Sequence, residues 1–345
     1  MTWIVRMAAV AALLIFGVAP GRAQTSAADF YRGKQVDLII ASSVGGGYDL
    51  LARVIAETMP NHIPGQPRMV PRNMVGAGGL TAANYIYNTA PKDGTAFVTV
   101  QNPIPFMPLF GEPQARFDAL KLNYVGSANS EVEVAFVWHT SKIQTLQDAI
   151  AQESTMATTG GGATSAFMAS AMNTFVGTKF KIITGYPGTA EVTLAVERGE
   201  VDGHPSIFWT TLKATKPQWL ANNQVRLLAQ LALKKHPDLP DLPLLLDFAK
   251  TEEDREALEL IFAAQLPGRP YLAPPDMPAD RLKVLQDAFM ATMEDPAFLA
   301  QAKKRDLEIQ PMTGPDVKAF ITKTYQTPKE IVDRVNAVRL AIQER

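Results

Sequence analysis

A short apolar run that meets three glycines and then restarts with helical spacing is the feature that most constrains the fold of this chain. Residues 36–40 form the run, Gly45, Gly46 and Gly47 follow it, and apolar residues then recur at helical spacing through Ile55. Glycine permits a positive φ and a close approach of the backbone to a ligand. Because the first N–H groups of a helix have no partner within it, this strand–glycine–helix unit is expected to bind an anion.

The same pattern recurs, which predicts an α/β protein with parallel strands. Residues 69–74 and 96–100 are predicted strands, and the helix between them opens at residues 76–79. A second unit repeats the order, with a glycine loop at residues 160–165 and a further loop at residues 186–189. Ligands of such sheets bind beyond the carboxyl ends of the strands, so the three loops are expected to converge on one cleft.

The last third of the chain is predicted to return to the first unit. Residues 260–266 are predicted as a strand, and residues 280–293, 296–304, 315–325 and 328–343 as helices. The expected organisation is therefore two lobes joined by crossing segments. Lobe 1 comprises residues 24–124 plus 230–345, and lobe 2 comprises residues 125–229.

The N-terminal residues read as an export signal. Arg6 precedes an apolar stretch at residues 7–19, and small residues lead up to Ala23. Residues 1–23 are expected to be a cleaved signal peptide, with the mature protein in the periplasm.

Composition excludes several functions. The chain of 345 residues has 33 basic and 34 acidic side chains, which argues against nucleic-acid binding. It contains no cysteine and only four histidines, none of them close together in sequence, so neither a metal site nor a cofactor is expected. The glycine loops also lack the pair of a lysine followed by serine or threonine that ends a phosphate-binding loop.

Some polar and aromatic residues have competing interpretations. Asp49 is placed as a helix N-cap as well as a site residue. Asp202 and His204 lie on one face of a predicted strand, which leaves an acid–base pair of a hydrolase or isomerase as an alternative to a structural role. Phe208 is expected in the core, and the acidic residues 252–256 on a solvated helix face.

The ordered motifs resemble one family. They are residues 44–49, 73–79, 90–94, 160–165 and 186–189, followed by Gly199 and Asp202. In this order and spacing the chain resembles the solute receptors of tripartite tricarboxylate transporters, the Bug family of periplasmic binding proteins.

The resemblance implies a two-lobed Venus-flytrap receptor of type II, with a ligand cleft between the lobes and the ligand's carboxylate held by backbone amides and water. This sequence departs from the common pattern of the family at residues 41–44 and at Pro187. These departures affect the part of the wall that is expected to select the rest of the ligand. The residues expected to bind ligand are Ser42, Val44, Gly45, Gly46, Gly47, Tyr48, Asp49, Gly161, Gly162, Ala163, Thr164, Ser165, Tyr186, Gly188, Thr189 and Asp202.

The expected function is capture of a small organic acid by a monomeric, non-enzymatic receptor and its delivery to the transporter's membrane subunits. A signalling receptor with the same cleft remains an alternative. The ligand stays open among dicarboxylates, tricarboxylates, aromatic acids and acidic amino acids.

Overall fold

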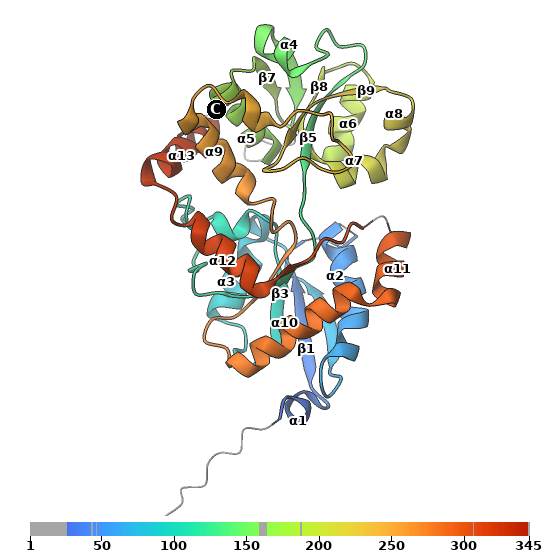
Figure 1. Ribbon diagram of the computed structural model, residues 1–345, viewed down its shortest axis with the longest axis vertical. Coiled ribbons are helices and arrows are strands. Elements are labelled where there is room, and N and C mark those ends of the chain that lie inside the picture. Colours follow the sequence, from blue (N-terminus) through green and yellow to red (C-terminus); the bar gives the residue numbers. More distant parts are fainter. Residues whose placement is uncertain are drawn as a thin grey trace, which may run out of the picture.

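The computed structural model describes residues 26–42, 44–45, 47–158, 164–186, 188–305 and 307–343, and the expected signal segment lies outside them. The chain folds into two lobes, each built on one mixed β-sheet covered by helices (Figure 1).

The first lobe contains a six-stranded sheet in the order β11-β4-β10-β3-β1-β2. Its strands are β1 (Gln35–Ile40), β2 (Arg68–Asn73), β3 (Ala96–Thr99), β4 (Asn123–Ser127), β10 (Pro270–Ala273) and β11 (Met312–Thr313). Its helices are α1 (Ala27–Tyr31), α2 (Gly47–Thr58), α3 (Leu80–Asn88), α10 (Ala279–Glu294), α11 (Pro296–Lys304) and α12 (Gly314–Thr324). The predicted parallel pairing is confirmed for β1, β2 and β3, whereas β10 runs antiparallel between β3 and β4.

The second lobe contains a five-stranded sheet in the order β7-β6-β8-β5-β9. Its strands are β5 (Glu133–Trp138), β6 (Ser154–Ala157), β7 (Phe180–Ile183), β8 (Gly203–Phe208) and β9 (Val225–Leu231). Its helices are α4 (Leu146–Ala151), α5 (Thr164–Ala171), α6 (Thr189–Glu197), α7 (Trp209–Thr215) and α8 (Pro217–Ala221). Here β5 is the antiparallel strand, inserted between β8 and β9 as β10 is inserted between β3 and β4 in the first sheet.

Strand β1 shows why the first sheet is buried on both faces. Val36 and Leu38 pack into one apolar cluster with α2 and α10, while Ile39 packs into a second cluster with α3 and α12. Successive side chains of a strand point to opposite faces, so the consecutive apolar residues 38–40 fit a strand with helices on both sides.

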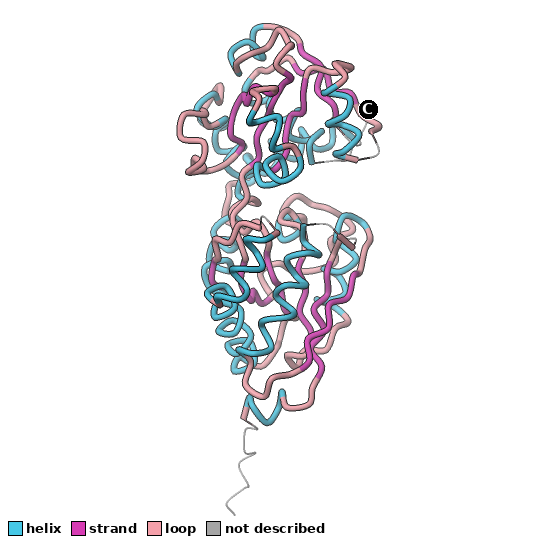
Figure 2. Tube along the Cα trace, turned by 90° about the vertical axis from the view of Figure 1, so that its right-hand side faces the viewer, coloured by secondary structure: helices cyan, strands magenta, loops and turns pink. Residues whose placement is uncertain are grey.

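Two segments that cross between the lobes, residues 128–132 and 264–269, run side by side. The Glu131 N–H donates to the Gln265 carbonyl at 2.9 Å, and the Gly268 N–H donates to the Asn129 carbonyl at 3.0 Å. Figure 2 shows the lobes one above the other, with the chain crossing between them along one side. These hydrogen bonds join the two crossing segments into one connection between the lobes.

The C-terminal part differs from the expected return to the first lobe. Helices α10, α11 and α12 cover the first sheet, but α9 (Glu252–Ala263) and α13 (Lys329–Gln343) pack in the core cluster of the second lobe. The predicted strand at residues 260–266 is wrong, because α9 occupies most of it. The acidic start of α9 is not wholly solvated either. Asp254 is 2% exposed and pairs with Arg334 of α13.

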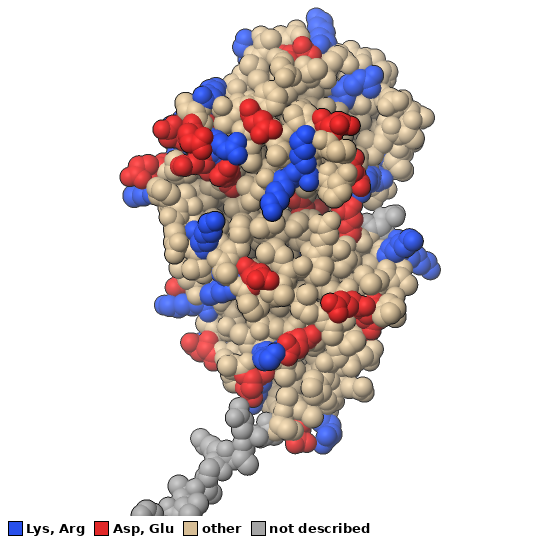
Figure 3. Space-filling view, in the orientation of Figure 1, with Lys and Arg blue, Asp and Glu red and all other residues tan. Residues whose placement is uncertain are grey.

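The surface carries no segregated charge on the face in Figure 3, where basic and acidic side chains are interspersed. Within the described ranges, none of the helices combines the length and apolar character that crossing a membrane requires.

Candidate functional site

A cavity of about 590 Å³ lies between the two lobes. Its wall combines the first lobe (Tyr48, Gln101), the second lobe (Thr164, Phe208) and the crossing segment (Gln265). Phe208 ends β8 and Gln101 follows β3 by two residues, so the cavity lies beyond the carboxyl ends of strands from both sheets. This is where α/β sheets bind their ligands.

Three helices begin at the cavity. Its wall includes Tyr48 near the start of α2, Leu80 at the start of α3 and Thr164 at the start of α5. Helix starts from both lobes therefore border one space. The starts of α2 and α5 offer the first N–H groups of a helix and the positive end of its dipole, an interaction worth about 0.3–1 kcal/mol for an anion. The start of α3 contributes less, because its Leu80 N–H donates to the Ala77 carbonyl and its Thr81 N–H to the Gly76 carbonyl.

The turn that precedes α3 was not among the expected site residues, yet Ala77 and Gly78 line the cavity. Ala77, Gly78 and Gly79 have φ values of 45°, 63° and 105°, and left-handed backbone of this kind favours glycine. The available signal was the glycine cluster before a helix, which is the pattern of the other two loops.

Asp49 organises the first glycine loop instead of lining the cavity. Its carboxylate accepts hydrogen bonds from the Gly45 N–H at 2.9 Å, from Arg53 Nε at 2.9 Å and from Asn73 Nδ2 at 2.8 Å. Burial raises the pKa of Asp49, but the hydrogen bonds from Arg53, Gly45 and Asn73 outweigh it and lower the pKa to about 2. Asp49 thus ties the loop, helix α2 and the end of β2 together.

Tyr48 is fixed at its hydroxyl while its side chain contributes to the wall. The hydroxyl donates to the Gly268 carbonyl at 3.0 Å and accepts from the Asn102 N–H at 3.1 Å. Burial raises its pKa, so it stays protonated. The Arg269 guanidinium lies 5.5 Å from the ring centroid and is paired with Glu131. The start of α2 is therefore tethered to the crossing segments.

Other expected residues of the first loop lie outside the described wall. The carbonyl of Ser42 accepts a hydrogen bond from Asn73 Nδ2, and the carbonyl of Gly47 accepts one from Arg269. Val44 is 74% exposed, and Gly45 has a φ of 86°. Gly46, Gly161, Gly162 and Ala163 are outside the described residues, as is Pro187.

The second and third loops contribute unequally. Thr164 lines the cavity, but half-buried Ser165 is absent from the described wall. Tyr186, Gly188 and Thr189 are absent from it too, and Tyr186 packs against an apolar cluster of the second lobe. Of the described part of the third loop, Tyr186 therefore has a packing role.

Asp202 does not belong to the described wall, because it precedes β8 and lies at the end of the sheet opposite the cavity. Its carboxylate accepts from Ser141 Oγ at 2.7 Å and from Thr155 N–H and Oγ1 at 2.8 Å. Buried His204 accepts from the Ser206 N–H at 3.1 Å, and burial lowers its pKa to about 4. The two side chains have separate partners, which favours structural roles over an acid–base pair.

Several wall residues escaped the sequence interpretation. Phe208 was expected in the core, but it is half-buried and lines the cavity. Gln265 lies in the crossing segment that was predicted as a strand, and Arg339 comes from α13. No local motif marks these positions, because the wall assembles from segments far apart in the chain.

Glu133 places a carboxyl group in the wall. It is 4% exposed, and Ser206 Oγ donates to its Oε2 at 2.5 Å. Burial is the main reason that its pKa rises to about 7, against the lowering effect of the Ser206 hydrogen bond, and the charge of Glu131 adds to the rise.

Binding of an anion in this cavity is expected to weaken as the pH rises through about 7, because Glu133 then becomes negatively charged. The pKa of Glu133 is about 7 in the folded protein and about 4.5 in the unfolded chain. Glu133 therefore contributes free energy of unfolding at low pH, and this contribution is lost as the pH rises from about 4.5 to about 7. Titration calorimetry between pH about 5.5 and about 8.5 should show binding that weakens with pH in the wild type and not in Glu133→Gln. In thermal melts, buried His204 raises the stability of both proteins as the pH rises to about 6.5, so the contribution of Glu133 is the difference between wild type and variant. Equal pH dependence in both proteins would remove Glu133 from the explanation.

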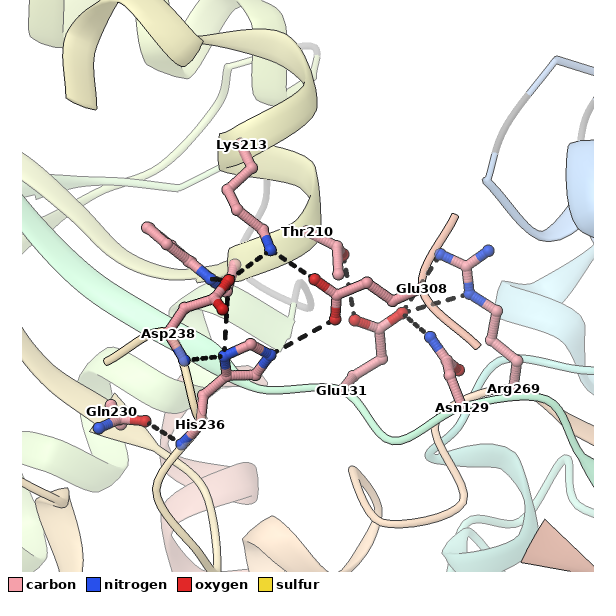
Figure 4. Close-up of polar contacts among 10 residues, drawn as sticks. Asn129, Glu131, Thr210, Lys213, Gln230, His236, Asp238, Arg269 and Glu308 are labelled. Carbon is pink, nitrogen blue, oxygen red and sulfur yellow. Dashed lines mark hydrogen bonds and ion pairs between the residues drawn. The ribbon is translucent and has the colours of Figure 1, made fainter. Parts of the chain in front are cut away.

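A polar cluster beside the cavity connects the lobes (Figure 4). Lys213 Nζ contacts Asp238 at 2.8 Å and Glu308 at 2.5 Å, and His236 Nε2 lies 3.4 Å from Glu308. His236, Asp238 and Glu308 have ligand atoms within 4.8 Å of one another. Because Lys213 is paired with both carboxylates, the cluster is an ion-pair network that joins the second lobe to Glu308 of the first.

This fold and cavity define a class: a two-lobed solute-binding receptor whose ligand site lies between the lobes. The family model described as tripartite tricarboxylate transporter family receptor matches residues 51–337, and the chain belongs to this family. Its members are receptors and not enzymes, consistent with the separate partners of Asp202 and His204. No curated protein matches the chain.

Solved structures show the same fold at low sequence identity. A solute-binding protein of this family from Polaromonas, without ligand, is 17% identical with a TM-score of 0.68, covering 88% of this chain and 99% of that one. Rpa4515 of R. palustris with adipate is 19% identical with a TM-score of 0.61, covering 88% and 97%. MatC of Rhodopseudomonas palustris with malate is 17% identical with a TM-score of 0.58, covering 89% and 99%.

Proposed function

We propose that this protein is an exported receptor that captures a small carboxylic acid in the cavity between its lobes and delivers it to the membrane subunits of a tripartite tricarboxylate transporter. The observation that carries the proposal is the convergence of helix starts from both lobes on one cavity, with Tyr48 on one side and Thr164 on the other. A carboxylate between them would accept hydrogen bonds from both lobes.

Energetics favour this arrangement over a single charged contact. Each interaction with a helix end supplies at most about 2 kcal/mol, whereas micromolar affinity needs about 8 kcal/mol. Several N–H donors and enclosure are therefore both needed. Ligand binding that joins the lobes also favours a closed state, and the membrane partner could distinguish this state from the open one by its shape.

Relatives and the N-terminal sequence support the rest of the proposal. Structures of similar fold hold adipate and malate, two carboxylic acids. Residues 1–23 have the charge, apolar stretch and small residues of a signal peptide, which supports export of the mature protein to the periplasm. We propose that it acts there as a monomer. We propose that the loops at residues 42–49 and 161–165 carry the ligand contacts. Residues 186–189 and Asp202, which were also expected to bind ligand, have no described place in the cavity wall, and we propose that they support the fold of the second lobe.

The proposal predicts that an organic acid stabilises the mature chain against heat. A ligand at about 100 times its dissociation constant adds roughly 2.7 kcal/mol to the free energy of unfolding. Thermal-shift screening with malate, adipate, citrate, phenylacetate and aspartate should therefore identify at least one acid that raises the melting temperature. The methyl esters of the same acids are matched controls, because they keep the carbon skeleton and lose the charge. Equal shifts by acid and ester, or no shift by any acid, would contradict the proposal.

A further inference from the structure

The ionisable groups of the cavity wall leave no described positive charge for a second carboxylate. Arg339 pairs with Glu112 at 3.0 Å, and its other terminal nitrogen donates to the Phe110 carbonyl at 3.1 Å. Glu133 then adds a second acidic group without a basic partner in the described wall. Because burying a charge without a partner is costly, the cavity suits a ligand with one carboxylate.

The rest of the wall suits a large apolar body. Met107, Phe110, Phe167, Phe208, Ile261 and Val335 all line the cavity. Its volume of about 590 Å³ lies within the range of sites that enclose drug-sized ligands. Such a wall gains from contact with a ring or a long hydrocarbon chain and gains little from a short, highly hydrated acid.

Gln265 is the exceptional polar residue of the wall. It is 3% exposed, and neither its amide nitrogen nor its amide oxygen has a hydrogen-bond partner. The contrast is Gln230, which is fully buried but donates to the Leu239 and Leu242 carbonyls at 2.8 Å and accepts from the His236 N–H at 2.7 Å. A buried amide without partners destabilises the empty protein, so Gln265 gains most from a group that both donates and accepts.

Other unpartnered atoms gather in the same wall. Gln101, Gln265 and Arg339 hold four of the eleven buried side-chain nitrogens and oxygens that lack a partner in the described chain. Because these unpartnered atoms belong to wall residues, we infer that polar groups of a bound ligand form hydrogen bonds with them.

We propose that the ligand is a monocarboxylic acid with a large apolar body, such as an aromatic ring, that carries a hydroxyl group bound by Gln265. The inference rests on the proposed receptor function and narrows its substrate class. Helix starts hold the carboxylate, the apolar wall covers the ring, and the Gln265 amide forms a hydrogen bond with the hydroxyl, through either its N–H or its oxygen.

The test compares 4-hydroxyphenylacetate, phenylacetate and malate by titration calorimetry. The wild type should bind the hydroxylated acid about tenfold more tightly than phenylacetate, a difference of ~1.4 kcal/mol, and malate most weakly. Gln265→Leu should bind the two aromatic acids equally, with an empty-state melting temperature no lower than that of the wild type, because leucine removes the unpartnered amide. Gln326→Leu, on an exposed turn outside the described wall, is the control and should keep the tenfold preference.

Three results would overturn the inference: tighter binding of malate than of either aromatic acid, an unchanged preference in Gln265→Leu, or a melting temperature lowered as far as in Gln230→Leu, which would make Gln265 structural. Each leaves the receptor function standing, because an acid still binds. Only the failure of every acid in the wider thermal-shift screen counts against that function.

Discussion

Asp49→Ala is expected to weaken carboxylate binding at least tenfold and to lower the free energy of unfolding by about 2–4 kcal/mol. The Asp49 carboxylate is 1% exposed and holds Gly45, Arg53 and Asn73 around the start of α2. Its removal leaves these donors without their acceptor. Because the Arg53 side chain is 38% exposed and can turn to water, the loss stays below that of a fully buried pair.

Urea denaturation and titration calorimetry measure both effects. Asp148→Ala is the matched control, because Asp148 forms the capping box of α4 and lies outside the described cavity wall. It should lower the stability less than Asp49→Ala does, through loss of the cap, and leave the affinity unchanged. Wild-type affinity in Asp49→Ala would show that the first glycine loop does not take part in binding.

Gly79→Val is expected to abolish binding, taken as at least a hundredfold loss, and to destabilise the protein by roughly 2–5 kcal/mol. Gly79 has a φ of 105°, which a β-branched residue adopts only with strain. A Cβ there would lie 2.0 Å from Gln101 Oε1 and 3.4 Å from Ile104 Cγ1. Both neighbours line the cavity, so the substitution moves the wall as well as the turn.

Gly33→Val separates backbone strain from the change in the wall. Gly33 also has a positive φ, 69°, but a Cβ there meets no atom within 4 Å, and it is not part of the described wall. This variant should lose only about 1–2 kcal/mol, with normal affinity in calorimetry. Equal affinities of Gly79→Val and Gly33→Val would disprove a role for the turn before α3.

Local signals predicted much of the first sheet. The apolar run of β1 and the helical spacing of α2 are consequences of nearest-neighbour geometry, so they are visible within a short window. Helices were expected after the two glycine loops, and α2 begins at Gly47 and α5 at Thr164, with Tyr48 and Thr164 in the cavity wall.

Errors arose where tertiary packing determines the outcome. Residues 260–266 form an apolar run whose periodicity alone does not distinguish a buried helix end from a strand. Asp254 lies in an acidic stretch, yet Arg334, 80 residues later, buries and pairs with it. The same docking of α13 brings Arg339 into the cavity wall. These partners are set by the path of the chain between the lobes.

Parts of the site were hidden for the same reason. Asp202 resembled a site residue because of its neighbours in the sequence, but the direction of β8 places it at the far end of the sheet. Gln265 has no motif around it and gains its place from the pairing of the two crossing segments.

A crystal structure of the mature protein with a bound acid from the screen would show directly where the ligand binds. We expect the carboxylate in the cavity between the lobes, with oxygens about 2.7–3.2 Å from backbone nitrogens at helix starts of both lobes. A carboxylate bound outside this cavity, or held by side chains of one lobe alone, would contradict it.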